Sequence, residues 1–272
     1  MRKLIIILAV AFVSLLFAGL AGAQLAAPSD SGVSVGQMYL VVADVDASVK
    51  FWTVLGGTPF KFGSETGVKF PGALIFLRKG DPTGGTVGSI INHIGFHVQD
   101  VQKSLPNWKA AGATIESTHG SKQAFIFTPD GLTRIEMIQD DSLPVPIAFH
   151  HVHFFVAASE ATGDPRENVQ AWYVKVFGAK PGKRGPFLTA NLPGGELTLT
   201  RSDSPIVGTK GRSLDHIGFE IKNLEAFCKD AKALGVKFDT PYAKRPDLGI
   251  ASAFLTDPWG TYIELTDGLD HY

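Results

Sequence analysis

The chain repeats one strand-first unit, and this repeat limits the folds open to it. Residues 93–98 match residues 216–221, since both read His-Ile-Gly-Phe, then an ionisable residue and an aliphatic one. In each copy a glycine follows the histidine by 19 positions and ends an amphipathic stretch. A turn with proline and glycine then leads to a last strand that carries Glu136 or Glu264. Each copy therefore predicts a strand, a helix and about three antiparallel strands.

Two fainter copies begin at Gln37 and His151, and each continues into a pair of aromatic residues followed by a glycine. A proline-rich stretch lies between the second and third copies, where a linker is expected. We therefore predict an α+β fold of four βαβββ units in two domains of two consecutive units. The expected segments are a first domain at residues 35–141, a linker at residues 142–148 and a second domain at residues 149–268.

The N-terminus has the pattern of a secretory signal. Arg2 and Lys3 precede an apolar run over residues 4–17, and Ala21-Gly22-Ala23 follows. We predict a signal peptide over residues 1–23, cleaved after Ala23, and a flexible leader over residues 24–34. The alternative is a retained membrane anchor, because the run approaches the roughly 20 apolar residues of a spanning helix. Cleavage implies a periplasmic or secreted protein with no membrane association.

Composition argues against a nucleic-acid partner. The chain holds 25 Lys and Arg against 26 Asp and Glu, and no long run carries one sign of charge. The single cysteine, Cys228, lies in a segment with helical spacing of apolar residues, which predicts a buried thiol. The charge balance therefore favours neither a nucleic acid nor a membrane surface as a partner.

Three residues of the second half form a candidate metal site. His151 shares a strand face with His153, and His216 shares one with Glu220. Glu264 lies in the middle of an apolar last strand, where a carboxylate is unfavourable without a partner. Two imidazoles and one carboxylate with open positions suit Zn²⁺, Mn²⁺ or Fe²⁺. We predict His151, His216 and Glu264 as the ligands.

The first half offers a weaker set, because a neutral amide replaces one imidazole. Its members are Gln37, His93 and Glu136. The competing interpretation for every histidine here is a structural residue whose hydrogen bonds are satisfied in the core.

These residues resemble the vicinal oxygen chelate superfamily, which includes glyoxalase I, the bleomycin and fosfomycin resistance proteins and the extradiol dioxygenases. The resemblance covers nearly all of the mature chain and rests on the strand-leading histidines, the aromatic pairs and the Asp-Pro-Trp-Gly turn before Glu264. It implies that paired units close into open barrels around a metal ion. By position it places ligands at His151, Thr198, His216 and Glu264 in the second domain, and at Gln37, Phe76, His93 and Glu136 in the first.

The resemblance implies a metalloenzyme that chelates adjacent oxygens of a small substrate, its expected partner, through Fe²⁺, Zn²⁺, Mn²⁺ or Ni²⁺, and the predicted signal peptide implies that this enzyme is exported. Lyase, isomerase or dioxygenase chemistry is expected, although Phe254 stands where ring-cleaving relatives carry a tyrosine. Glu264, Glu220 and His153 are the candidate catalytic bases, and the sequence does not choose among them. The alternative is a metal-free protein that binds or sequesters small molecules, of the bleomycin-resistance type.

Overall fold

Four βαβββ units follow one another along the chain, in the order that the repeat predicts. The computed structural model describes residues 25–158 and 163–272. The first two units comprise β1 (Val33–Val42), α2 (Val45–Val54), β2 (Thr58–Phe62), β3 (Glu65–Phe70) and β4 (Ala73–Lys79), then β5 (Ile91–Val98), α3 (Val101–Ala110), β6 (Thr114–His119), β7 (Gln123–Phe127) and β8 (Arg134–Gln139). The last two comprise β9 (Ile147–Ala157), α4 (Pro165–Phe177), β10 (Lys180–Arg184), β11 (Phe187–Leu192) and β12 (Gly195–Ser202), then β13 (Leu214–Ile221), α5 (Leu224–Ala233), β14 (Phe238–Arg245), β15 (Ile250–Thr256) and β16 (Tyr262–Asp267), with a final 3-10 turn, η1 (Leu269–His271).

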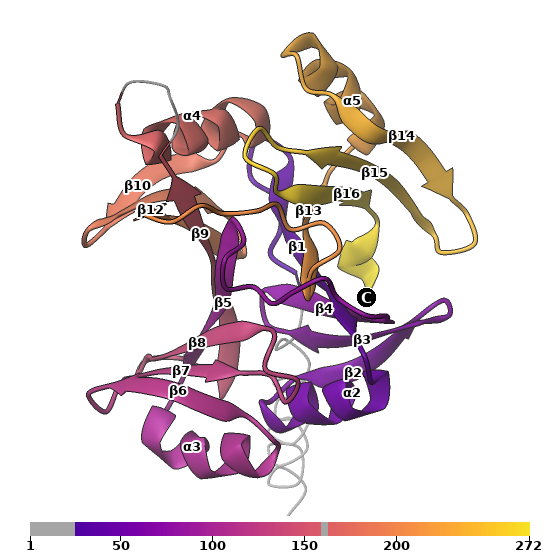
Figure 1. Cartoon of the computed structure of the whole chain (residues 1–272). Coiled ribbons are helices and arrows are strands. Elements are labelled where there is room, and N and C mark those ends of the chain that lie inside the picture. The colour runs from indigo at the N-terminus through magenta and orange to yellow at the C-terminus, as the bar shows by residue number, and fades with distance from the viewer. Residues whose placement is uncertain (1–24, 159–162) are drawn as a thin grey trace, which may run out of the picture.

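The units pair into two open, eight-stranded sheets (Figure 1), which confirms the predicted fold class. One sheet, the 1/4 sheet, has the order β14-β15-β16-β13-β1-β4-β3-β2 and joins the first and fourth units. The other, the 2/3 sheet, has the order β10-β11-β12-β9-β5-β8-β7-β6 and joins the second and third units. The predicted pairing of consecutive units, first with second and third with fourth, is therefore wrong.

The first strands of the paired units lie side by side and antiparallel at the centre of each sheet. In the 1/4 sheet β1 pairs with β13, and Tyr39 lies opposite His216. In the 2/3 sheet β5 pairs with β9, and His153 lies opposite His93. His216 and His93 therefore occupy equivalent positions in the two sheets, and so do Tyr39 and His153.

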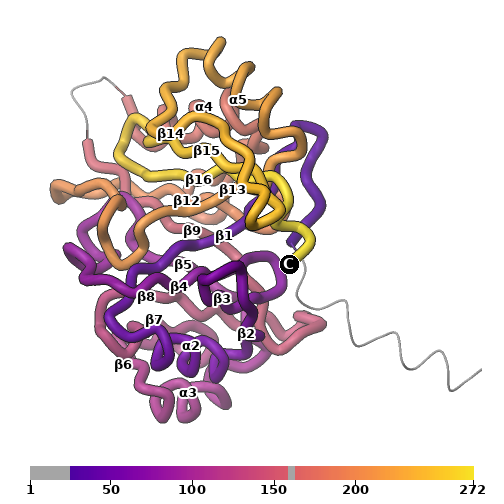
Figure 2. Tube along the Cα trace, turned by 90° about the vertical axis from the view of Figure 1, so that its right-hand side faces the viewer, coloured from indigo at the N-terminus to yellow at the C-terminus, as the bar shows by residue number. Residues whose placement is uncertain are grey.

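Strand alternation divides each first strand between a core face and a concave face. In β5, Ile94 and Phe96 are fully buried in the hydrophobic core, while His93 and His97 point to the opposite side. One continuous core runs through both sheets and includes Trp52. Helices α2 and α3 lie at one end of the molecule and α4 and α5 at the other (Figures 1 and 2). The polar side chains are therefore gathered on the concave faces.

Each unit begins its helix with the same local signal. The side chains of Asp44, Asp100, Asp164 and Asn223 cap the four helices by accepting a hydrogen bond from a backbone N–H of the first turn. Such caps satisfy groups that the helix leaves unpaired. The start of each of these four helices is thus specified by a residue of its own unit.

Two predicted segment boundaries need correction. The predicted leader over residues 24–34 overlaps β1, which begins at Val33, and Leu25 is buried. The hydroxyl of Ser31 also donates to the carbonyl of Phe177 at 3.0 Å, which fastens this segment to the third unit. The predicted linker extends too far, because β9 begins at Ile147.

The predicted signal peptide, residues 1–23, lies outside the described residues. Within residues 25–158 and 163–272, no helix is long and apolar enough to cross a membrane.

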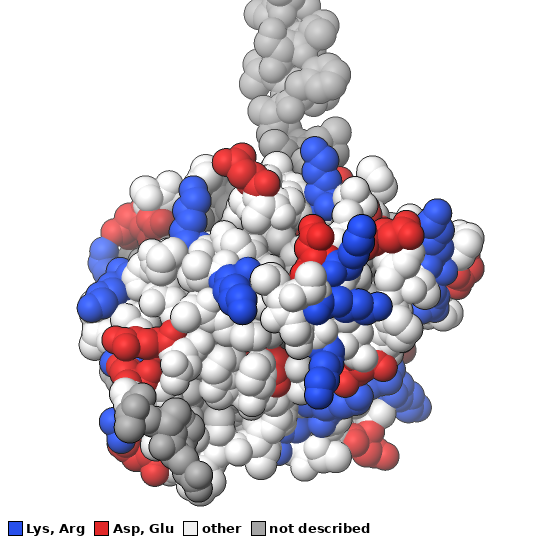
Figure 3. Space-filling view, turned by 90° about the horizontal axis from the view of Figure 1, so that it is seen from above, with Lys and Arg blue, Asp and Glu red and all other residues white. Residues whose placement is uncertain are grey.

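Figure 3 shows the molecule from above, with basic and acidic side chains interspersed over that face. Cys228 is buried in α5, as predicted, and burial raises the pKa of its thiol to about 11.

Candidate metal centre

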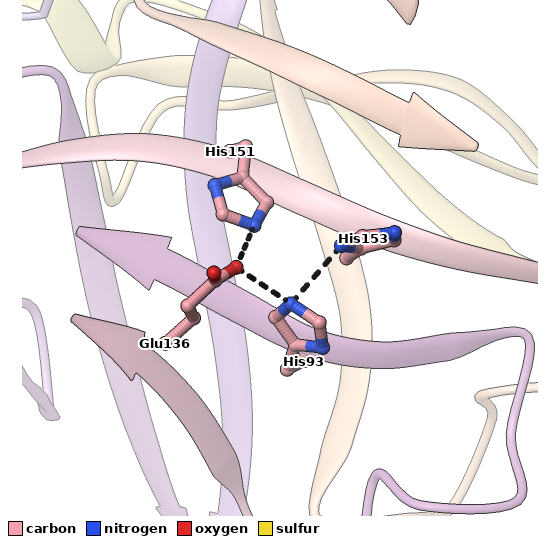
Figure 4. A group of neighbouring side chains, drawn as sticks. All are labelled: His93, Glu136, His151 and His153. Atoms are coloured by element: carbon pink, nitrogen blue, oxygen red, sulfur yellow. Dashed lines mark hydrogen bonds and ion pairs between the residues drawn. The ribbon is translucent and has the colours of Figure 1, made fainter. Parts of the chain in front are cut away.

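Four ionisable side chains converge on the concave face of the 2/3 sheet (Figure 4). His93 comes from β5, Glu136 from β8, and His151 and His153 from β9. Nε2 of His93 and Nε2 of His151 each lie 3.1 Å from Oε2 of Glu136. Nδ1 of His153 lies 3.1 Å from Nε2 of His93. All four residues are buried, and their candidate ligand atoms lie within 4.8 Å of one another.

The outward ring nitrogen of each histidine is held by a neighbour. The contacts are Nδ1 of His93 to Oδ1 of Asn92 at 2.9 Å, Nδ1 of His151 to Nδ1 of His150 at 2.9 Å, and Nε2 of His153 to Oγ1 of Thr200 at 2.7 Å. Because Asn92 Oδ1 can only accept, His93 donates from Nδ1 and turns an unprotonated Nε2 to the centre. Outer contacts of this kind orient the imidazoles of metal sites.

His151 contains a buried polar atom without a hydrogen bond. Its Nε2 is close to Glu136 in distance, but the contact lacks hydrogen-bond geometry, and the atom has no other partner. Such an atom costs about 1–3 kcal/mol when nothing compensates it. The backbone makes room for this ring, because a Cβ at Gly95 would lie 2.0 Å from Cε1 of His151. A divalent ion bound at Nε2 would satisfy the atom, so these donors fit a metal.

The environment favours the protonation states that metal ligands need. Burial lowers the pKa of His93 to about 4, although the contact with Glu136 opposes this effect. Burial and the neighbouring His93 and His151 lower the pKa of His153 to about 2. Burial raises the pKa of Glu136, but its short contacts with His151 and His93 outweigh burial and hold the pKa below its ordinary value. At neutral pH, His93 and His153 are therefore neutral and Glu136 is charged.

A cavity of about 390 Å³ adjoins the four residues, and both Glu136 and His153 line it. Phe125 and Phe187 contribute apolar surface, and Arg184 contributes a positive charge. The guanidinium of Arg184 lies 5.5 Å from the centre of the Phe187 ring. A small molecule in this cavity would therefore contact the proposed ligands directly.

The predicted ligand set His151, His216 and Glu264 is not brought together. His216 and Glu264 lie in β13 and β16 of the 1/4 sheet, whereas His151 lies in β9 of the 2/3 sheet. The physical reason is the pairing of units, which combines His151 with residues of the second unit. The grouping was therefore wrong, although His151 lies in the four-residue cluster.

The weaker set is divided in the same way. His93 and Glu136 lie in the metal-like cluster, but Gln37 lies in β1 of the 1/4 sheet. There the amide of Gln37 donates to Oε2 of Glu264 at 2.8 Å, and Nε2 of His216 lies 3.3 Å from the same oxygen. The two predicted sets have thus exchanged one member each.

The candidate catalytic bases also separate. His153 belongs to the cluster, but Glu264 and Glu220 lie in the 1/4 sheet. Glu220 is buried and accepts hydrogen bonds from the backbone N–H groups of Gly268 and Leu269. Sequence reasoning did not include His153 among the ligands, yet its position two residues after His151 on one strand was an available signal.

Comparison with known proteins gives one family match and several structural matches. Residues 149–265 match the family model described as Glyoxalase/Bleomycin resistance protein/Dioxygenase superfamily. Glyoxalase I from Zea mays is 20% identical with a TM-score of 0.68, over 88% of this chain and 94% of that chain. A candidate dioxygenase from Bacillus subtilis is 12% identical with a TM-score of 0.64, over 92% of this chain and 88% of that chain. No curated protein sequence matches the chain. The structural matches show a shared fold.

Proposed function

We propose that this chain is a metal-dependent enzyme of the Glyoxalase/Bleomycin resistance protein/Dioxygenase superfamily, whose family model matches residues 149–265. His93, Glu136, His151 and His153 are the proposed ligands of one divalent ion. The observation that carries this proposal is the buried convergence of their four ligand atoms, one of which has no other partner. The substrate is a small molecule with two adjacent oxygens.

Three imidazoles and one carboxylate suit Fe²⁺, Zn²⁺, Mn²⁺ or Ni²⁺. Four protein ligands leave two positions on a six-coordinate ion, which is the number that two adjacent oxygens require. Such an ion supplies Lewis acidity, which stabilises negative charge on a bound oxygen. Asn92 and Thr200 hold the outer nitrogens of His93 and His153, so that the inner nitrogens keep their direction.

The residues around the cavity orient the site and limit access of water. The amide of Gln123 donates to Oε1 of Glu136, which leaves Oε2 facing the histidines. Phe125 packs edge-on against His93, and Phe187 packs edge-on against His153. Arg184 is fixed by Oε1 of Glu196 at 2.9 Å and adds positive charge to the cavity. These features favour a substrate with negative or developing negative charge.

Metal content of two matched variants tests the proposed centre. Glu136 and Glu264 occupy the same position in equivalent strands of the two sheets, opposite Gly95 and Gly218 respectively. We expect elemental analysis to find about one divalent ion per wild-type chain, far less in Glu136→Gln, and an unchanged amount in Glu264→Gln. Loss of metal in Glu264→Gln with retention in Glu136→Gln would sink the assignment. A wild-type protein without metal would instead support a metal-free binding protein.

The chelation of adjacent oxygens needs a separate measurement. We expect acetohydroxamate, which offers two adjacent oxygens, to change the visible spectrum of the Co²⁺-loaded protein. His153→Gln should weaken this response, since His153 lines the cavity as well as the cluster. An unchanged spectrum at saturating acetohydroxamate, in a protein that holds Co²⁺ at these residues, would contradict the proposed substrate class.

We also propose that the chain is exported and that its mature form begins at Gln24. The support is the basic, apolar and small-residue pattern of residues 1–23. Intact mass and N-terminal sequencing of the protein from a periplasmic or culture fraction test this proposal. A protein that retains Met1 in a membrane fraction would favour the anchor instead.

A further inference from the structure

A second cavity, of about 240 Å³, lies on the concave face of the 1/4 sheet. Gln37, His216 and Glu264 line it, and they occupy the positions that His151, His93 and Glu136 hold in the other sheet. Sheet register also places Tyr39 opposite His216, where the other sheet places His153 opposite His93. The cavity is thus the structural counterpart of the metal cluster with two imidazoles replaced.

The inward-facing groups of this cavity are already joined by hydrogen bonds. His216 engages a carboxylate with each ring nitrogen, Asp215 at 2.7 Å and Glu264 at 3.3 Å. The amide N–H of Gln37 donates to the same oxygen of Glu264. Burial lowers the pKa of His216, but its contacts with Asp215 and Glu264 outweigh burial and raise it, whereas the pKa of His93 is lowered. A histidine that donates from both nitrogens, as His216 does here, has no lone pair for a metal. This arrangement favours an organic ligand over an ion.

Aromatic rings form much of the cavity wall. Phe254 and Tyr262 are stacked with centres 5.4 Å apart, and Tyr39 is stacked on His216 with centres 4.5 Å apart. Phe76 lines the cavity beside them. An apolar cavity of about 150 Å³ is sufficient for benzene, so about 240 Å³ has room for one ring with small substituents. The walls therefore fit a planar ring.

The charged residues of the cavity favour an acidic ligand. Its carboxylates have close partners: Glu65 accepts from the Tyr39 hydroxyl at 2.6 Å, and Asp215 accepts from the backbone of Gly211 at 2.6 Å. The two arginines of the cavity lack such close partners. Arg78 and Arg245 have side chains that are 54% and 49% exposed, and their nearest carboxylates lie 3.9 Å away. Guanidinium groups bind carboxylates in a two-pronged geometry.

The buried end of the cavity offers hydrogen-bond acceptors. Oε1 of Gln37 is buried without a hydrogen-bond partner. The carboxylate of Glu264 lines the cavity beside it. Because a buried acceptor without a donor is unfavourable, a ligand hydroxyl at this end would stabilise the complex.

We propose that the 1/4 sheet binds, without a metal, a small aromatic carboxylic acid that carries a hydroxyl group opposite its carboxylate. The carboxylate contacts Arg78 and Arg245, the ring packs between the aromatic walls, and the hydroxyl donates toward Glu264 and Gln37. This site is separate from the proposed metal centre and does not depend on its function.

Isothermal titration calorimetry with 4-hydroxybenzoate tests the proposal on the full mature protein. We expect one molecule to bind per chain, with the same affinity before and after metal removal by EDTA. Arg78→Gln combined with Arg245→Gln should weaken binding about 10- to 100-fold, the range for lost hydrogen bonds to charged groups. Benzoate, which lacks the hydroxyl, and 4-hydroxybenzyl alcohol, in which a neutral alcohol replaces the carboxylate, should both bind more weakly.

Arg201→Gln is the matched control, because Arg201 is 60% exposed and lies 3.8 Å from a carboxylate but does not line the cavity. Its affinity for 4-hydroxybenzoate should equal that of the wild type. Absence of binding, binding that requires metal, or full affinity in the double arginine variant would each overturn the proposal. So would a divalent ion that the wild type holds and His216→Ala loses. None of these results depends on whether the 2/3 sheet holds an ion.

Discussion

Replacement of Gly95 by alanine should weaken binding of a divalent ion at the proposed metal centre while leaving the fold intact. A Cβ at this position would lie 2.0 Å from Cε1 and 2.2 Å from Nδ1 of His151. An ordinary carbon contact is about 3.5 Å, so the imidazole must move by roughly 1.5 Å. A metal–ligand distance tolerates about 0.2 Å. We therefore expect the affinity for a divalent ion to fall by about 100-fold, the upper end of losses caused by displaced supporting residues.

Gly218→Ala provides the matched control in the other sheet, where a Cβ would lie 2.1 Å from Cδ of Gln37. Each substitution forces one methyl group into a packed sheet, which costs about 1–3 kcal/mol of unfolding free energy. Urea denaturation should thus show similar losses for both variants. Competition with a chromophoric Zn²⁺ chelator at pH 7 should show weakened binding in Gly95→Ala alone. Wild-type affinity in Gly95→Ala, or equal loss in both variants, would refute the reasoning.

Three further predictions concern stability. Burial lowers the pKa of His93 to about 4, so between about pH 6.5 and pH 4 the unfolded chain holds the proton that the folded chain does not. His93 alone should therefore contribute a loss of about 3 kcal/mol of unfolding free energy to the metal-free protein as the pH falls through that window, and His93→Gln should remove this share of the pH dependence in urea denaturation at several pH values. Trp52 is fully buried, and Trp52→Ala should cost about 3–5 kcal/mol; a melting temperature within 2 °C of wild type, roughly the shift for 1 kcal/mol, would contradict this. Asp100 accepts from the N–H of Lys103 at 2.9 Å, so Asp100→Ala should lower the unfolding free energy by about 1 kcal/mol in the same assay, and no change would show that the cap is not needed.

Much of the site could be predicted from local sequence because its signals are local. The alternation of His93, Gly95 and His97 with Ile94 and Phe96 determines which side chains face away from the core. The last-strand glutamates were identified because a carboxylate among apolar residues needs a partner. The residue types of the candidate metal cluster were therefore predicted, and the superfamily that the sequence resembles is the one whose family model matches residues 149–265.

The four βαβββ units, their helix caps and the strand positions that carry polar side chains follow from the sequence alone, because each depends on interactions within one unit. The pairing of the units instead depends on contacts between residues far apart in the sequence. Gly95 makes room for His151 and Gly218 makes room for Gln37, and both glycines lie in the same His-Ile-Gly-Phe pattern, so the local sequence does not specify which partner each one receives. Since all four first strands alternate in the same way, local pattern favours no pairing over another. The contacts between distant units settle that choice, and with it they place His93, Glu136, His151 and His153 together in one sheet and leave His216 and Glu264 with Gln37 in the other.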